Sequence, residues 1–296
     1  MGEGYTLLTT PRAQELAPEL ARRAAAVHEV PSGRVDEIAG GLLADVEGEL
    51  LVALGGGRVI DTAKALAAAR AAGERARVAA IPTTLSAAEM TVVHRRAAGA
   101  DGSLPGARPA IVINDPALSA SQPEAQLAAS AANALGHAIE GPATIRCHPL
   151  PALAGREVAR LIGEAYGSGG DPDRDALALG ALLSGYAIDA CGYGLHHVLS
   201  QTLARLGGVS HAQANAAMLP HTLGALRSRG AGDTGAALEL ARDLARRAGV
   251  SRLGELGVGE QALDECADVA SRRPDLDLTP PRLSRGEIRA LYEAAL

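Results

Sequence analysis

Four of the eight histidines in the chain fall within residues 194–221, among side chains that are mostly small or aliphatic. His197 and Gln201 are four residues apart in this segment, so they share a face if it is helical. His211 follows after the break at Gly207-Gly208. Imidazole rings in such surroundings can transfer protons, polarise a substrate oxygen or bind a metal.

A second pair with the same spacing lies upstream, because Asn133 and His137 are also four residues apart in a segment of helical composition. Three imidazoles arriving from two helices and a loop could form a trigonal metal platform, with Asn133 as a fourth ligand. The alternative is a set of ordinary buried polar groups in a helical core. Residue types and spacing alone leave both interpretations open.

Three consecutive glycines, Gly55, Gly56 and Gly57, follow the apolar run Glu49–Leu54 and precede a helical pattern. Glycines let a chain turn sharply and let a phosphate approach the N–H groups at a helix N-terminus. The loop matches neither the P-loop nor the GxGxxG pattern, so a tight turn is the alternative interpretation. Asp61 lies in the first turns of the helix, where it could contact a cofactor or simply favour the helix dipole.

Hydroxyl side chains follow the next strand candidate, since Thr83 and Thr84 come after Arg77–Ile81. Ligands of open α/β sheets bind beyond the carboxyl ends of the strands. For Thr84, a local bond that caps a helix is the alternative. The two junctions together favour a phosphate-binding edge of the sheet.

The elements that must position these residues alternate in the first part of the chain. Strand candidates are Tyr5–Thr9, Glu49–Leu54, Arg77–Ile81 and Ala110–Asn114, and helical composition covers residues 11–27 and 58–72. This alternation predicts an open parallel sheet covered by helices.

After Asp115-Pro116 the apolar residues recur with helical spacing and strand patterns disappear. Breaks are expected at Gly167–Pro172, at Gly207-Gly208 and at Arg273-Pro274. We predict an α/β dinucleotide-binding domain over residues 1–117, followed by an all-helical catalytic domain over residues 118–296.

Composition excludes several classes of protein. The net charge is −6 and basic residues form no block, so we expect no nucleic-acid partner. Three scattered cysteines and an N-terminus without a signal-peptide pattern indicate the cytoplasm. The least charged region, Ala176–Ala204, is interrupted by Asp189 and by His196-His197, which indicates a buried helix and no membrane span.

Four motifs in this order resemble the iron-containing (group III) alcohol dehydrogenase family, most closely its maleylacetate reductase branch. They are GGGxxxDxAK from Gly55, IPTTxxxxEMT from Ile81, NALxHAIE from Asn133, and HHxLxxxLxxLxxxxHAxxNAxxLPH from His196. The resemblance implies a nucleotide-binding α/β domain and a helical domain, with the active site in the cleft between them.

The resemblance also implies roles for the histidines. Metal-dependent members bind the metal through an aspartate and three histidines, which correspond to Asn133, His137, His197 and His211. Asparagine lacks the negative charge of that aspartate, and the maleylacetate reductase branch resembles this chain in this respect. We expect no tightly held metal, and a divalent iron or zinc ion on the three histidines is the alternative.

Two further positions depart from the family pattern. Gln201 stands where relatives usually have a histidine that is assigned to proton relay, and glutamine cannot act as an acid or base near neutral pH. We therefore expect His137 or His197 to be the proton donor. Residues 85–88, Leu-Ser-Ala-Ala, are poorer in glycine than is common in relatives.

The expected activity is reduction of a carbonyl or enoyl acid by NAD(H) or NADP(H) in the interdomain cleft of a cytoplasmic homodimer. The pyrophosphate would lie over Gly56 and Gly57, with Thr83 and Thr84 on its other side. Arg12 could meet a 2′-phosphate. The alternatives are a non-redox lyase, isomerase or cyclase on the same scaffold, and a non-catalytic nucleotide-binding relative.

Overall fold

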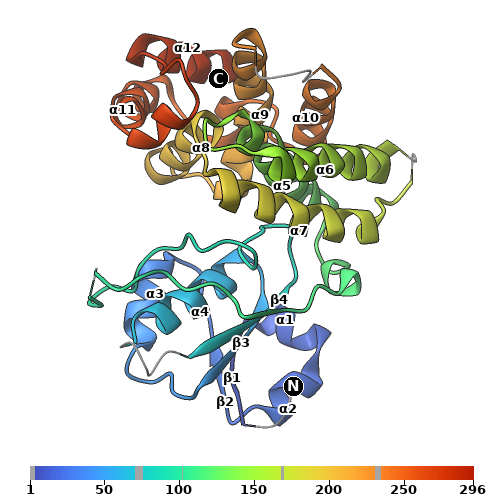
Figure 1. Cartoon of the computed structure of the whole chain (residues 1–296), viewed down its shortest axis with the longest axis vertical. Coiled ribbons are helices and arrows are strands. Elements are labelled where there is room, and N and C mark those ends of the chain that lie inside the picture. The colour runs from blue at the N-terminus through green and yellow to red at the C-terminus, as the bar shows by residue number, and fades with distance from the viewer. Residues whose placement is uncertain (1–3, 71–75, 102, 168–169, 231–234) are drawn as a thin grey trace. The chain divides into compact units, whose positions relative to one another are not determined.

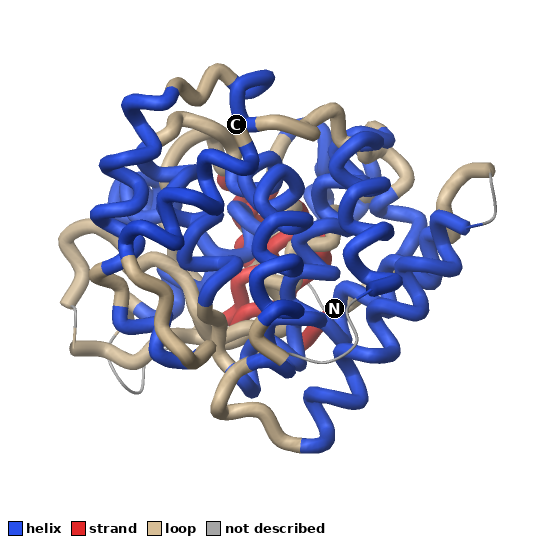
Figure 2. The backbone as a smooth tube through the Cα atoms, turned by 90° about the horizontal axis from the view of Figure 1, so that it is seen from above, coloured by secondary structure: helices blue, strands red, loops and turns tan. Residues whose placement is uncertain are grey.

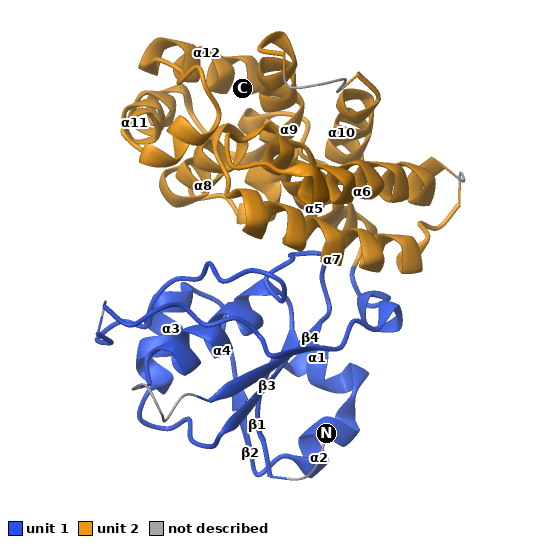
Figure 3. Cartoon of the chain, viewed as in Figure 1, with its two compact units in different colours: residues 1–122 blue, residues 123–296 orange. Residues whose placement is uncertain are grey.

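The computed structural model describes residues 4–70, 76–101, 103–167, 170–230 and 235–296 (Figure 1). The chain divides into two compact units, residues 1–122 and residues 123–296 (Figure 3). The predicted boundary after residue 117 lies near this division.

A five-stranded parallel sheet forms the centre of the first unit, in the order β2-β1-β3-β4-β5. The strands are β1 (Thr6–Thr9), β2 (Ala26–Glu29), β3 (Leu50–Gly55), β4 (Arg77–Pro82) and β5 (Ile111–Val112). In the sheet, β2 lies on one side of β1 and the later strands lie on the other side, so the strand order switches between β1 and β3. In open α/β sheets this is where a ligand binds, beyond the carboxyl ends of the strands.

The prediction of one helix over residues 11–27 is wrong. The segment contains α1 (Pro11–Leu16), α2 (Pro18–Arg23) and then the edge strand β2. Pro18 has no N–H and starts a new helix, so Ala17 between the two helices leaves the helical region, with φ −143°. The side chains of β2 are mostly exposed, so the strand lacks the apolar alternation by which a strand is found in sequence.

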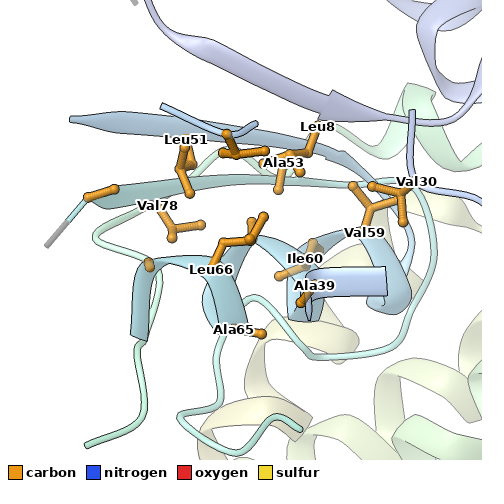
Figure 4. Packing of buried hydrophobic residues seen from close by; sticks show 14 of the residues in the cluster. Leu8, Val30, Ala39, Leu51, Ala53, Val59, Ile60, Ala65, Leu66 and Val78 are labelled. Carbon is orange, nitrogen blue, oxygen red and sulfur yellow. The ribbon is translucent and has the colours of Figure 1, made fainter. Parts of the chain in front are cut away.

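Helices cover both faces of the sheet. On one face, side chains such as Leu8, Leu51 and Val78 pack against α3 (Val35–Leu42) and α4 (Gly57–Ala68) (Figure 4). The alternate strand residues, such as Leu7, Val52 and Ile81, pack with Ala13 of α1 and Leu20 of α2 on the other face. The continuous apolar run of β3 follows from burial on both faces. Helix α4 ends at Ala68, earlier than predicted, and residues 71 and 72 lie outside the described part.

The second unit is helical, and its described residues contain no strand, as predicted. Figure 2 shows the strands as one group and helices over most of the chain. The α-helices are α5 (Glu124–Ala143), α6 (Pro149–Gly167), α7 (Arg174–Cys191), α8 (Leu195–Leu206), α9 (His211–Ser228), α10 (Gly235–Arg247), α11 (Glu260–Ser271) and α12 (Arg285–Ala295). Short 3-10 helices are η1 (Pro116–Ser119) in the first unit and η2 (Leu253–Leu256) and η3 (Pro274–Leu278) in the second.

Helix α5 is almost completely buried, and glycines allow its neighbours to approach it closely. A Cβ atom on Gly155 of α6 would lie 2.4 Å from the carbonyl oxygen of Ala138 in α5. A Cβ atom on Gly136 would lie 2.8 Å from the ring of His196 in α8. The small residues of α5 therefore let the histidine-bearing helices meet.

The weakly charged region Ala176–Ala204 is two helices, α7 and α8, and not one. Gly192 between them has φ +74°, which favours glycine, and the two helices are bent by 102° at this break. Within the described residues, no single helix is long and apolar enough to cross a membrane, and α7 and α8 meet that test only as a bent pair.

Candidate functional site

The glycine loop lies directly against the loop that follows β4. Gly56 is the N-cap of α4, and a Cβ atom there would lie 3.1 Å from Oγ1 of Thr84. A Cβ atom on Gly57 would lie 3.0 Å from Oγ of Ser86. Because Gly56 has no side chain to cap α4, N–H groups in the first turn of this 12-residue helix can face an anion.

The structure brings together the residues that the sequence assigns to the cofactor, with one exception. The N–H group of Thr83 donates to the carbonyl oxygen of Gly55 at 3.0 Å, so the two junctions are joined at adjacent strands. Asp61 instead accepts a hydrogen bond from Nζ of Lys64 at 2.8 Å. The roles of Gly55, Gly56, Gly57, Thr83, Thr84 and Asp61 at a cofactor stay predictions.

Lys64 is fully buried and connects α4 to the segment after the threonine loop. Its ammonium group donates to the carbonyl oxygens of Ala88 and Val93 at 3.0 and 2.9 Å, in addition to Asp61. A buried ammonium is stable only with such partners. Lys64 therefore holds the segment that contains Ala88 and Val93 against α4.

Glu89, in the same segment, is only 1% exposed. Burial raises the pKa of Glu89 to about 7, and the nearby Lys64 opposes that rise. Its Oε2 atom has no hydrogen-bond partner in the described structure.

A pocket opens at the carboxyl ends of β1 and β2. Its lining includes Thr9, Thr10, Glu15 and Glu29, and no basic side chain is among the residues that line it. Arg12 does not line this pocket. The charged side chains of this pocket are therefore the carboxylates of Glu15 and Glu29, and not the guanidinium of Arg12 that the sequence suggested.

Three imidazoles from three helices meet in the second unit. The rings of His137 in α5 and His197 in α8 are stacked, with centroids 4.7 Å apart and planes 18° apart. The ring of His211, the first residue of α9, lies 6.5 Å from that of His197. His196 meets His197 edge-on at 5.0 Å. The predicted histidines are thus neighbours.

Burial keeps the rings of His137, His196 and His197 neutral near pH 7. It lowers the pKa of His137 well below its usual value and lowers the pKa values of His196 and His197 to about 3. The neighbouring histidines and, for His197, Arg273 add to this effect. A neutral imidazole has one N–H group and one lone pair, so the bonds at each ring decide which nitrogen accepts.

Glu140, which the sequence reasoning did not single out, lies fully buried beneath His197. Its carboxylate accepts the backbone N–H groups of His196 and His197 and lies 2.6 Å from Nδ1 of His197. Burial raises the pKa of Glu140, and the neighbouring His196 and the backbone N–H donors oppose that rise. In the sequence, Glu140 could have been found from its position three residues after His137 in NALxHAIE, which places both residues on the same side of a helix.

Gln201 and Arg273 form a polar group beside the histidines. Nη1 of Arg273 donates to Oε1 of Gln201 at 2.8 Å, and its guanidinium lies 5.8 Å from the ring centre of Tyr193. That ring lies 5.9 Å from His197. Sequence reasoning missed Arg273, because only the break before Pro274 marked this region.

The donor set does not fit a tightly held divalent cation. Oδ1 of Asn133 is buried without a partner and is a neutral oxygen, so the set contains no anionic ligand. Nε2 of His211 lies 3.0 Å from Nδ2 of Asn215, and the charge of Arg273 acts at His197. Among the described residues, no group of three His, Cys, Asp or Glu side chains is arranged to hold a metal.

Comparison with known proteins gives the same family over both units. The family model described as iron-containing alcohol dehydrogenase matches residues 11–116, and the C-terminal model of the Fe-containing alcohol dehydrogenase family matches residues 127–250.

Curated relatives and solved structures agree with these matches. The maleylacetate reductase of Sphingobium indicum is 30% identical over an alignment that covers 93% of this chain and 84% of that protein. The maleylacetate reductase of Burkholderia cepacia is 31% identical over 82% of this chain and 73% of that protein. The crystal structure of maleylacetate reductase from Agrobacterium tumefaciens has a TM-score of 0.85 at 28% identity, covering 99% of this chain and 89% of that one.

Proposed function

The chain belongs to the iron-containing alcohol dehydrogenase family and is an NAD(P)H-dependent oxidoreductase, and from this premise we propose that it reduces a short oxo or enoyl acid with NADH. The observation that carries the proposal is the group of neutral histidines beside the guanidinium of Arg273. Location in the cytoplasm and assembly as a homodimer stay predictions.

The preference for NADH rests on the pocket at the ends of β1 and β2. The nucleotide's pyrophosphate would lie at Gly56 and Gly57, and its adenosine ribose would extend to the strand ends on the other side of the switch between β1 and β3. Glu29 and Glu15 line that pocket. A carboxylate accepts hydrogen bonds from ribose hydroxyls and repels a 2′-phosphate, so NADPH would bind more weakly.

The preference for an acid rests on Arg273. Its side chain is only 16% exposed, and its guanidinium donates to Gln201 at 2.8 Å and pairs with Asp275 at 2.9 Å, so its positive charge near the histidine rings is fixed in position and partly balanced by Asp275. Guanidinium groups bind carboxylates through paired, charge-assisted hydrogen bonds. The name of the relatives, maleylacetate reductase, points to a substrate of the same chemical class.

In this proposal the histidines position the substrate, and solvent replaces His137 or His197 as the expected proton donor, because burial leaves both rings neutral near pH 7. Nδ1 of His137 lies 3.5 Å from Oγ of Ser184, whose own hydroxyl donates to Ala181. Nδ1 of His197 faces Glu140. The Nε2 atoms of both rings therefore accept hydrogen bonds from a bound water that also donates to the substrate carbonyl, or from the hydroxyl group of the product. NADH, when bound, would supply the hydride for the electrophilic carbon, and the proton would come from solvent through that water.

Loss of NADH absorbance tests the proposal. The purified chain would be incubated with NADH and maleylacetate, with simple 2-oxo and enoyl acids, and with the methyl ester of each acid. We expect turnover of acids and little turnover of esters, since an ester cannot pair with Arg273. Absence of NADH oxidation with every acid would contradict the proposal. Substrate loss without NADH oxidation would instead favour a lyase or isomerase.

A further inference from the structure

The first turn of α8 lacks a capping side chain of its own, because its N-cap is Gly194. The free N–H groups of a helix start need acceptors when the start is buried. The N–H group of Leu195 donates to Oγ1 of Thr279 at 3.2 Å. Those of His196 and His197 donate to the two carboxylate oxygens of Glu140. Glu140, a residue of α5, therefore serves as the cap of α8.

The same carboxylate reaches the side chain at the end of that turn. Oε2 of Glu140 lies 2.6 Å from Nδ1 of His197, and both side chains are almost fully buried. The ring of His197 is also held by the stacked His137 and by His196 at its edge. Nε2 of His197 has no partner in the described structure. The ring is therefore hydrogen-bonded at Nδ1, whereas its buried Nε2 atom is unpaired.

We propose that Glu140 is a positioning residue that fixes His197 as the tautomer with hydrogen on Nδ1, so that Nε2 is the acceptor presented to substrate. The catalytic consequence rests on the proposed function, whereas the tautomer does not. Two backbone N–H groups already point at the carboxylate, at a helix N-terminus where negative charge is favoured. Its remaining partner, Nδ1 of His197, is therefore the donor.

His196 provides the internal comparison. Its Nδ1 lies 2.9 Å from Oγ1 of Thr222, whose hydroxyl is within hydrogen-bond distance of the carbonyl oxygens of Met218 and Leu219. His196 is thus oriented by a neutral acceptor within the helical core, and His197 by a carboxylate. Carboxylate partners of functional histidines fix both the ring orientation and the tautomer.

Long-range proton–nitrogen correlation spectra of histidine-labelled protein test the tautomer directly. The signals of His197 would be identified by their loss in His197→Gln. In the wild-type chain we expect a protonated Nδ1 and a bare Nε2. In Glu140→Gln the amide can donate to Nδ1, so the proton should move to Nε2. A wild-type spectrum with hydrogen on Nε2 would overturn the proposal, and this measurement needs neither a substrate nor a stable Glu140 variant.

Kinetics of the same variants test the consequence. We expect Glu140→Gln to lower kcat about 100-fold with little change in KM, as for other partners that orient a functional histidine. The matched control is Thr222→Val, which removes the acceptor of His196 and should leave kcat and the His197 spectrum unchanged. Wild-type kcat in Glu140→Gln would reduce Glu140 to a helix cap and overturn its positioning role. If no acid is turned over by the wild-type chain, the proposed function fails while the spectra still decide the tautomer.

Discussion

The glycine loop and the histidine group are built in opposite ways. The glycine loop uses backbone N–H groups at the ends of adjacent strands, and its charged neighbours are paired among themselves, as Lys64 is with Asp61. The histidine group uses side chains from α5, α8 and α9, and the rings of His137 and His197 are neutral. An added Cβ atom is therefore expected to disturb the structure of the loop, whereas the histidine group depends on the hydrogen-bond partner of each ring.

This difference determines which substitutions are informative. At the loop, a slightly larger side chain should weaken cofactor binding without changing any group that takes part in the reaction. At the histidines, a substitution that changes the hydrogen bonds of a ring should change kcat without changing the affinity for the cofactor. His197→Ala and Gly57→Ala separate these two effects, Glu89→Gln tests a buried carboxyl group beside the loop, and Asn133→Asp tests the missing anionic ligand beside the histidines.

The largest effect is expected for His197→Ala. Loss of the ring removes the acceptor Nε2 and leaves the carboxylate of Glu140 without its side-chain partner. We expect kcat for an acid substrate to fall about 1000-fold, while NADH affinity stays within about twofold. Steady-state kinetics and calorimetric titration with NADH measure the two quantities. His148→Ala, at an exposed position, is the control, and comparable turnover in both variants would refute the assignment.

Glu89→Gln should change how stability depends on pH. The pKa of Glu89 is raised to about 7 in the folded chain, so the folded state holds the proton more tightly than the unfolded state. Its stabilising contribution is complete below about pH 4.5 and is lost as pH rises through about 7, which amounts to about 3 kcal/mol.

The variant should therefore gain stability relative to the wild-type chain between about pH 5 and about pH 8. Urea unfolding across this range measures the difference. Parallel stability curves for the two proteins would show that Glu89 does not titrate in this window.

A smaller effect is expected for Gly57→Ala. The added Cβ atom would lie 3.0 Å from Oγ of Ser86 and would narrow the approach to the first turn of α4. We expect the Kd for NADH to rise about tenfold, with kcat at saturating NADH nearly unchanged. Gly41→Ala is the matched control, because a Cβ atom there has no neighbour within 4 Å. Equal NADH binding by both variants would leave the loop as a turn only.

The same contrast explains how much of the molecule the sequence predicts. The parallel sheet and the glycine junction follow from local signals, namely an apolar run, three glycines and a helix. The strand β2 was missed because its side chains are exposed at the sheet edge and because it pairs with β1 across the intervening helices α1 and α2. Local composition does not encode such pairing.

At the histidine group the spacing of Asn133, His137, His197 and His211 indicated the right elements, but the partners of the rings could not be read from it. Glu140 acts on His197 across 57 positions of sequence, and Arg273 meets Gln201 across 72. Such contacts depend on how helices pack, which glycines such as Gly136 permit but do not specify.

An effect of the same size as for Gly57→Ala, about tenfold, is expected for Asn133→Asp. Oδ1 of Asn133 is buried without a partner, and a carboxylate in its place would add the anionic ligand that the three histidines lack. We expect the affinity for Zn²⁺ to rise about tenfold, measured by calorimetric titration of metal-stripped protein. The rise is limited to this size because the added negative charge also interacts with the neighbouring histidine rings. Unchanged affinity would mean that Arg273 and the bond between His211 and Asn215 oppose the metal more strongly than the missing charge does.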